Sequence, residues 1–200
     1  MYQTSEPSYT SRGGSQPGNL VSPARPGLEG RFEFWRQIGS GARIEIAPGF
    51  HDSTSHVDGV AVPSHLFSVD WLIQPFPKLQ VTGMFFQGQN AAGIGALHQG
   101  FTVLSGDRVV PVHAVGGWTQ FSYLATKRLS FNIYGGQESD RARDLLSGDI
   151  QRNFVYAGNF IYKLGSNVLL SAEASQARTR YFLLPNRLNN HYDLALGYLF

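Results

Sequence analysis

The sequence contains no cysteine, and only 15% of its 200 residues are charged. The lack of cysteine excludes a disulfide framework, a cysteine-based zinc site and a thiol nucleophile. No stretch approaches the 18 consecutive apolar residues that indicate a transmembrane helix. The 16 Lys and Arg residues nearly balance the 14 Asp and Glu residues. This balance gives no reason to expect nucleic acid as a partner, although the sequence pI is about 9.0.

Apolar, aromatic and small residues are abundant instead. Hydrophobic residues make up 42% of the chain and aromatic residues 13%, with 23 Gly and 10 Pro, yet the mean hydropathy is only −0.17. This apolar content is enough to order the chain, so wholesale disorder is excluded. The charged fraction lies well below the roughly 25% of ordinary soluble domains. Small and polar residues must therefore dilute the apolar ones along the chain.

The first segment, residues 1–29, is rich in Ser, Pro and Gly. It has no positively charged start followed by an apolar run, so it is not a secretory signal. The Pro17-Gly18 and Pro26-Gly27 pairs favour turns. We therefore expect a loop or tail over residues 1–29 and a folded unit over residues 30–200.

From Gly30 onward the dominant hydrophobic period is two residues, which predicts strands with one apolar and one polar face. A few apolar residues, such as Met84 and Phe86, break the polar face, and Arg36 breaks the apolar one. Nine segments of about ten residues follow the pattern: Arg31–Ile38, Arg43–Phe50, His65–Gln74, Leu79–Gly88, Gly117–Thr126, Arg128–Gln137, Arg152–Lys163, Val168–Arg178 and His191–Phe200.

The connections between these segments alternate strictly between short and long. The short ones are 39–42, 75–78, 127 and 164–167, and the long ones are 51–64, 89–116, 138–151 and 179–190. Tight turns on one side and long loops on the other are typical of up-and-down barrels in an outer membrane. We therefore expect an all-β fold, an antiparallel up-and-down transmembrane β-barrel wall of about nine strands.

The alternative is a soluble β-sandwich or barrel. The apolar stripes are too bulky and too aromatic to fill the interior of a small soluble barrel. Facing outward, they would form a lipid-facing belt with aromatic rings at the interfaces. The candidate ring members are Trp71, Tyr123, Tyr162, Tyr192, Tyr198 and Phe200.

The polar positions of the same strands are candidates to line a water-filled pore. They are Arg31, Glu33, Arg43, Glu45, Asp70, Gln80, Gln120, Asn132, Asn159, Glu173 and Asp193. The first four form either a charge ladder that sets a transverse field or simple ion pairs inside the barrel. Asp70, Glu173 and Asp193 would favour cations if they are unpaired.

The last strand ends in Phe200, with alternate apolar residues at Tyr192, Leu194, Leu196 and Tyr198. This pattern resembles the terminal β-signal of Gram-negative outer-membrane proteins. The resemblance implies export to the periplasm and recognition by the β-barrel assembly machinery. More widely, residues 30–200 resemble the C-terminal portion of porin-type barrels, and Gly83–Gly100 and Gly116–Gln120 resemble segments of porin-like proteins.

A periplasmic C-terminus places the long loops outside the cell and also places residues 1–29 there. Single-chain bacterial barrels have even strand numbers and both ends periplasmic. The strand count therefore predicts that the chain is a fragment of a longer barrel. Porin-type barrels are often trimers, which makes a homotrimer one expected assembly.

Other chemistry has weak support in the sequence. His51, Asp52, His56 and Asp58 are metal-capable residue types on an expected loop, and no GxSxG or HExxH pattern occurs. Loop 89–116 folds either into the pore or outward, and the expected loop 138–151 carries Arg141 and Arg143, which could contact lipopolysaccharide. We expect no catalytic residues, no metal and no cofactor.

The functional hypothesis is an outer-membrane channel for passive diffusion of small hydrophilic solutes, and not an enzyme. Outer-membrane lipids, lipopolysaccharide and the β-barrel assembly machinery are the expected partners. The alternatives are a non-conducting outer-membrane barrel, such as a receptor, adhesin or translocator wall, and more remotely an outer-membrane barrel enzyme.

Overall fold

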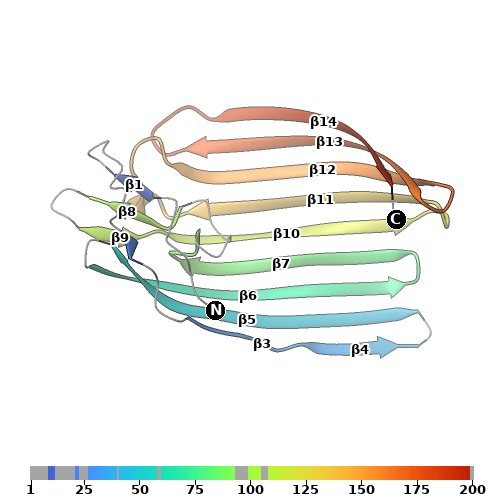
Figure 1. The fold of residues 1–200 in the computed structure, drawn as a ribbon, viewed down its shortest axis with the longest axis horizontal. Coiled ribbons are helices and arrows are strands. Elements are labelled where there is room, and N and C mark those ends of the chain that lie inside the picture. Colours follow the sequence, from blue (N-terminus) through green and yellow to red (C-terminus); the bar gives the residue numbers. More distant parts are fainter. Residues whose placement is uncertain are drawn as a thin grey trace.

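A computed structural model describes residues 9–11, 21–22, 27–39, 41–57, 60–92, 99–104 and 108–198. Phe200 of the expected terminal signal and Asp58 of the weak metal group lie outside these residues. Within them, no helix is long and apolar enough to cross a membrane. The long strands lie side by side in one curved sheet (Figure 1). They are β3 (Leu28–Arg31), β4 (Phe34–Ile38), β5 (Ala42–Val57), β6 (Val60–Phe76), β7 (Leu79–Gln89), β10 (His113–Leu124), β11 (Leu129–Asp140), β12 (Ile150–Leu164), β13 (Val168–Tyr181) and β14 (Arg187–Tyr198).

The sheet is an antiparallel meander. Its order is β14-β13-β12-β11-β10-β7-β6-β5, and β3, β4 and the short β2 (Val21–Ser22) pair with β5. The all-β up-and-down prediction is thus confirmed, with β3 and β4 in place of the first expected strand. In the described residues no pairing joins β14 to β3 or β4, so the sheet is open at both edges.

Pro48 of β5 explains why the first expected strand is split in two. Phe32 donates its backbone N–H to the Pro48 carbonyl at 3.0 Å. Proline has no N–H to return the bond, so the ladder loses a hydrogen bond at this position. The edge strand is interrupted at Phe32 and Glu33, directly opposite this gap.

The prediction of a long loop over residues 51–64 is wrong. β5 runs on to Val57 and β6 starts at Val60, and these two residues lie opposite each other in register. The segment HDSTSHV is polar on both faces, so it lacks the alternation from which a strand is predicted. The expected loops 138–151 and 179–190 likewise shorten to residues 141–149 and 182–186.

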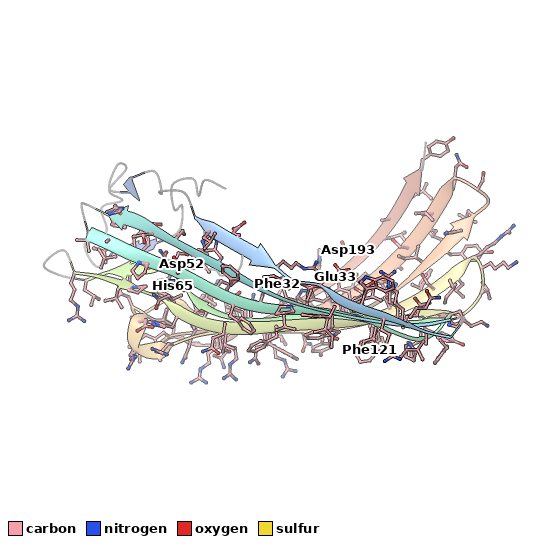
Figure 2. The ribbon with its side chains drawn as sticks, turned by 90° about the horizontal axis from the view of Figure 1, so that it is seen from below. Phe32, Glu33, Asp52, His65, Phe121 and Asp193 are labelled. Atoms are coloured by element: carbon pink, nitrogen blue, oxygen red, sulfur yellow. The ribbon has the colours of Figure 1, made fainter. Side chains whose placement is uncertain are left out.

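The two faces of the sheet differ in chemistry. Directly paired residues of an antiparallel ladder share a face, so the register assigns each side chain. Figure 2 shows Glu33 and Asp193 on the concave side of the wall and Phe121 on the convex side. We call these the polar face and the apolar face. Large side chains of the apolar face are exposed, including Ile133 at 67% and Leu194 at 78%.

The apolar residues form a band that crosses the sheet diagonally. On the apolar face of β6 they run from Phe67 to Ile73, and on β13 from Val168 to Ala174. The hydrogen-bonding register leads from Ile73 on β6 through β7, β10, β11 and β12 to Ala174 on β13. The turn-side end of the band on β6 is therefore level with its loop-side end on β13. A horizontal band on strongly tilted strands has this geometry.

Gly83 tests the close packing of this face. A Cβ at Gly83 would meet the Trp71 ring and would lie 2.5 Å from the Trp118 carbonyl oxygen, whereas a Cβ at Gly158 would lie 3.7 Å from its nearest contact, the Asn132 oxygen. We expect Gly83→Ala to lower the free energy of unfolding by about 1–3 kcal/mol, measured as a lower urea midpoint. Gly158→Ala is the matched control and should leave the midpoint nearly unchanged. Equal midpoints for the two variants would contradict the packing described.

Candidate functional site

All of the expected pore-lining residues occupy one face of the sheet. The register pairs place Arg43, Glu45 and Asp70 on the same face as the polar residues of β10 to β14. Arg31 lies opposite Gly49 on that face, and Glu33 follows two residues later. The concave surface is therefore the candidate functional site, and its chemistry is that of charged, amide and hydroxyl groups.

A row of directly paired polar residues crosses six neighbouring strands of this face. We call it the polar belt: Gln80, Ser122, Asn132, Asn159, Glu173 and Asp193. Gln120 lies next to the belt and donates from Nε2 to Ser122 Oγ at 2.9 Å. The strands β7, β10, β11, β12, β13 and β14 thus each contribute one polar side chain at the same register level.

Hydrogen bonds fix the side chains of the belt. Asn132 Nδ2 donates to Asn159 Oδ1 at 2.7 Å, and Asn159 Nδ2 donates to Glu173 Oε2 at 2.9 Å. The Tyr134 hydroxyl donates to the other carboxylate oxygen of Glu173 at 2.7 Å. Beside Glu173, Asp193 lies 3.1 Å from His191 Nδ1. In the described residues no Lys or Arg forms an ion pair with either carboxylate, so this part of the belt carries negative charge.

The charges at the other side of the sheet are paired. Arg31 donates through Nε and Nη2 to the two carboxylate oxygens of Asp70 at 3.0 and 2.7 Å, and through Nη1 to Glu33 at 2.9 Å. Arg43 forms an ion pair with Glu45 on its own strand. Of the two interpretations of these residues, the geometry matches ion pairing within the wall. Asp70 is therefore compensated, in contrast to Glu173.

Sequence reasoning missed three groups of this face. Ser122 and Tyr134 share the position parity of Gln120 and Asn132 and would have been found by applying that parity strictly. The third group lies at the loop end, where His51 Nδ1 is 2.8 Å from Glu29 and His51 Nε2 is 2.8 Å from Ser53. It was missed because this segment was expected to be a loop.

The weak metal group does not assemble among the described residues. His51 lies on the polar face, whereas Asp52 is paired with His65 on the opposite face at 2.7 Å. His56 lies on the same face as Asp52, five residues along β5 from His51 and on the opposite face from it. No set of three His, Asp or Glu side chains in the described part of the chain could hold a metal ion.

The described part of loop 89–116 lies over the polar face. It contains β8 (Phe101–Val103) and β9 (Val109–Pro111), which pair with each other at the loop end of the wall, and β8 also pairs with the short β1 (Tyr9–Ser11) (Figure 1). Phe101 is fully buried against Val57 and Val62 of the polar face. Ser64 Oγ donates to the Asn90 carbonyl at 2.6 Å. The inward alternative for this loop is therefore the one that the structure has.

The loop also contacts the connection between β11 and β12, which contains the short 3-10 helix η2 (Ala142–Asp144). Thr102 Oγ1 donates to the Asp144 carbonyl at 2.7 Å, and Gln99 Nε2 donates to Asp149 Oδ2 at 3.0 Å. His113 Nδ1 lies 2.9 Å from Asp144 Oδ2. The inward loop thus spans the mouth of the concave surface, from β5 and β6 on one side to residues 141–149 on the other.

Asp140 is buried where these two loops meet. It ends β11, beyond the apolar stretch of that strand, and is 7% exposed. Neither carboxylate oxygen has a hydrogen-bond partner among the described residues. Burial, and then the nearby carboxylates of Glu138, Asp149 and Asp144, raise the pKa of Asp140 from 3.8 to about 8.

This raised pKa makes the packing of the inward loop against the wall sensitive to pH. With the loop in place Asp140 stays protonated up to about pH 8, whereas with the loop opened it loses its proton above about pH 4. The free energy that holds the loop in place therefore falls as pH rises from about 4 to 8 and is constant above 8. We expect trypsin cleavage after Arg108 to increase by more than about tenfold between pH 6 and 8. Cleavage after Arg128, in an exposed turn, serves as the internal standard.

The Asp140→Asn variant keeps the shape of the side chain but removes the titratable carboxyl group. Its normalised cleavage after Arg108 should stay low and flat over this pH range. An equally steep increase in the Asn variant would show that another group controls the loop.

Comparison with known proteins adds one structural match to this geometry. No protein-family model and no curated protein matches the chain. The structure is similar to that of the outer membrane channel DcaP of Acinetobacter baumannii, with a TM-score of 0.66 and 10% sequence identity. The match covers 84% of this chain and 61% of that one, so the chain spans less than two thirds of the length of that channel. At this identity the likeness concerns the fold alone: the antiparallel wall of this chain is similar to the part of that channel which the match covers.

Proposed function

We propose that the protein is a porin-like channel of a Gram-negative outer membrane, through which small hydrophilic solutes diffuse passively. The observation that carries this proposal is the diagonal apolar band on the convex face, opposite a concave face lined by the polar belt. A soluble protein rarely leaves such a contiguous apolar surface open to water. A lipid bilayer removes that cost, and the wall fold shared with an outer-membrane channel supports the same placement.

The band is tallest on β12, where its height suits a bilayer. On the apolar face of β12 the band runs from Phe154 to Leu164. This stretch is roughly 33 Å along the strand, and at a tilt of about 40° it covers roughly 25 Å, the height of the apolar belt of outer-membrane barrels. Residues beyond this height, such as Asp52 and His65, belong to the extracellular part of the wall.

Insertion into lipid also requires partners for the two edges of the sheet. An edge strand in hydrocarbon leaves backbone N–H and C=O groups unsatisfied. We therefore propose that in the membrane β14 and the β3–β4 edge are each hydrogen-bonded to a further antiparallel strand, so that the wall forms part of a closed barrel. The exposed apolar row of β14, Tyr192 to Tyr198, together with Phe200, is the proposed recognition site for the β-barrel assembly machinery.

The concave face would then select solutes by size and charge. Amide and hydroxyl groups of the polar belt suit hydrated solutes, and the inward loop narrows the extracellular end. Nothing in the proposal requires a reaction or a cofactor. The competing function is a non-conducting barrel. The same inward loop favours it, because the loop reaches across the loop end of the concave face from β5 and β6 to residues 141–149.

Planar-bilayer recording of the full-length protein separates the two functions. A channel should give stable ohmic steps after insertion, with currents that scale with salt concentration. Protein that inserts, as shown by protease protection in vesicles, and yet carries no current would reject the channel and favour a receptor, adhesin or translocator wall.

Glu173, the carboxylate of the belt that forms no ion pair within the described residues, should set the ion preference. Glu173→Gln removes a charge that no cationic side chain of the described residues neutralises, so the ratio of cation to anion permeability should fall by about twofold. Asp52→Asn is the matched control, since it removes one carboxylate from the opposite face of the wall. Reversal potentials in a salt gradient provide the measurement. The same shift for both variants would show that the polar face does not line the conducting path.

A further inference from the structure

Three arginines gather on the apolar face, just beyond the loop-side end of the band. Arg152 of β12 lies directly opposite Arg180 of β13, and Arg178 lies opposite Phe154 in the adjacent pair of that face. All three side chains are exposed. We call them the arginine cluster.

The cluster has no acidic partner in the described part of the chain. Arg178 Nε donates to the neutral Gln176 at 3.0 Å, and none of the three guanidinium groups forms an ion pair there. Arg31 and Arg43, on the polar face, are both paired with carboxylates. Like charges directly opposite each other on a sheet are destabilising. An arrangement that keeps them together without a carboxylate suits an external anion.

The arginine cluster borders a hollow of about 390 Å³. Arg187 also borders this hollow, but the register pairs it with Thr179 of the polar face, and its guanidinium stacks on Tyr181 at 5.6 Å from the ring centroid. The Phe154 side of the hollow is apolar and faces the band. The site therefore offers planar, bidentate donors at its outer side and an apolar wall at its inner side, a pairing that suits a phosphate attached to an apolar body.

A second hollow, of about 610 Å³, lies on the same face, on the turn side of the hydrogen-bonded Tyr156–Gln176 pair. The small residues Gly158, Ala172 and Ala174 form its floor, and Phe131, Ile133 and Phe160 form its walls. Along β13, Ala174 precedes Arg178 by four residues, which is roughly 13 Å. The two hollows therefore form one amphipathic surface, with cationic groups at the loop end and an apolar groove within the band.

We infer that this surface binds a phosphorylated glycolipid of the outer leaflet, with a phosphate on the arginine cluster and an acyl chain along the groove. The inference rests on the proposed outer-membrane location, because that location brings headgroup phosphates to the height at which the cluster lies. Charge complementarity selects an anionic headgroup, and the groove selects a ligand with a hydrocarbon chain. An acidic protein segment would satisfy the arginines but would leave the groove empty.

Native mass spectrometry of the full-length protein in neutral detergent tests this inference. The probes are diphosphorylated lipid A, its dephosphorylated form and inorganic phosphate. We expect the triple variant R152Q/R178Q/R180Q to retain about tenfold less diphosphorylated lipid than the parent. The matched control K78Q/K127Q/R128Q removes the same charge from exposed turns at the other end of the wall, and its retention should stay within about twofold of the parent.

The remaining arms separate the sources of binding. Dephosphorylated lipid should be retained weakly and equally by all variants, and inorganic phosphate should not compete at millimolar concentration. Ala174→Leu fills the groove and should weaken retention of the diphosphorylated lipid, whereas Ala42→Leu, at the far side of the same face, should not. Competition by inorganic phosphate, equal losses in the two triple variants, or no effect of Ala174→Leu would overturn the inference. If the groove were instead buried between copies of the chain, Ala174→Leu would leave lipid retention unchanged but would alter the oligomer mass.

Failure of this inference is distinguishable from failure of the proposed function. The triple variant should conduct like the parent, because the arginine cluster lies outside the concave face. A parent that retains the phosphorylated lipid but carries no current would reject the channel and leave the lipid site standing.

Discussion

The in-register antiparallel ladder is the constraint on which the rest of the structure depends. Because side chains alternate every second residue, pairing alone decides which groups share a face. A slip of one residue between β12 and β13 would move Asn159 and Glu173 to opposite faces and would break the hydrogen-bonded chain from Asn132 to Tyr134. The belt, the diagonal band and the arginine cluster are three consequences of the same register.

The concave face of the wall is stabilised in two different ways along the strands. At the loop end, the inward loop provides apolar packing, with Phe101 against Val57 and Val62, and Phe86 against Ala91 and Ala114. Toward the turns the concave face has polar networks in place of apolar packing. Such networks keep a surface hydrated and still fix its side chains, which is compatible with a solute path. The loop therefore supplies the packed part of the fold.

Much of this architecture could be predicted from the sequence, because a period of two residues is a direct record of the ladder. The nine strands and the face of every expected pore-lining residue follow from it. The ends of β5 and β6 could not be predicted, since residues 51–57 and 60–64 are held by pairing rather than by an apolar stripe. The position of the loop was also beyond the pattern, yet Met84 and Phe86, which looked like errors on the polar face, lie where the loop packs. These two apolar exceptions thus marked the covered part of the wall, whereas Trp118 and Leu124, also on the polar face, are exposed.

The same logic applies to charged exceptions on the apolar face, and there the charge differs around the wall. At β5 and β6 the band ends at Asp52 and His65, which form a 2.7 Å pair with each other. At β12 and β13 it ends at Arg152, Arg178 and Arg180, which have no such counterpart among the described residues. A uniform ring of interfacial anchors would not produce this asymmetry, because snorkelling cations serve equally well on every strand. An anion bound at β12 and β13 would account for the asymmetry, because several cationic groups would then converge on one ligand at these strands alone.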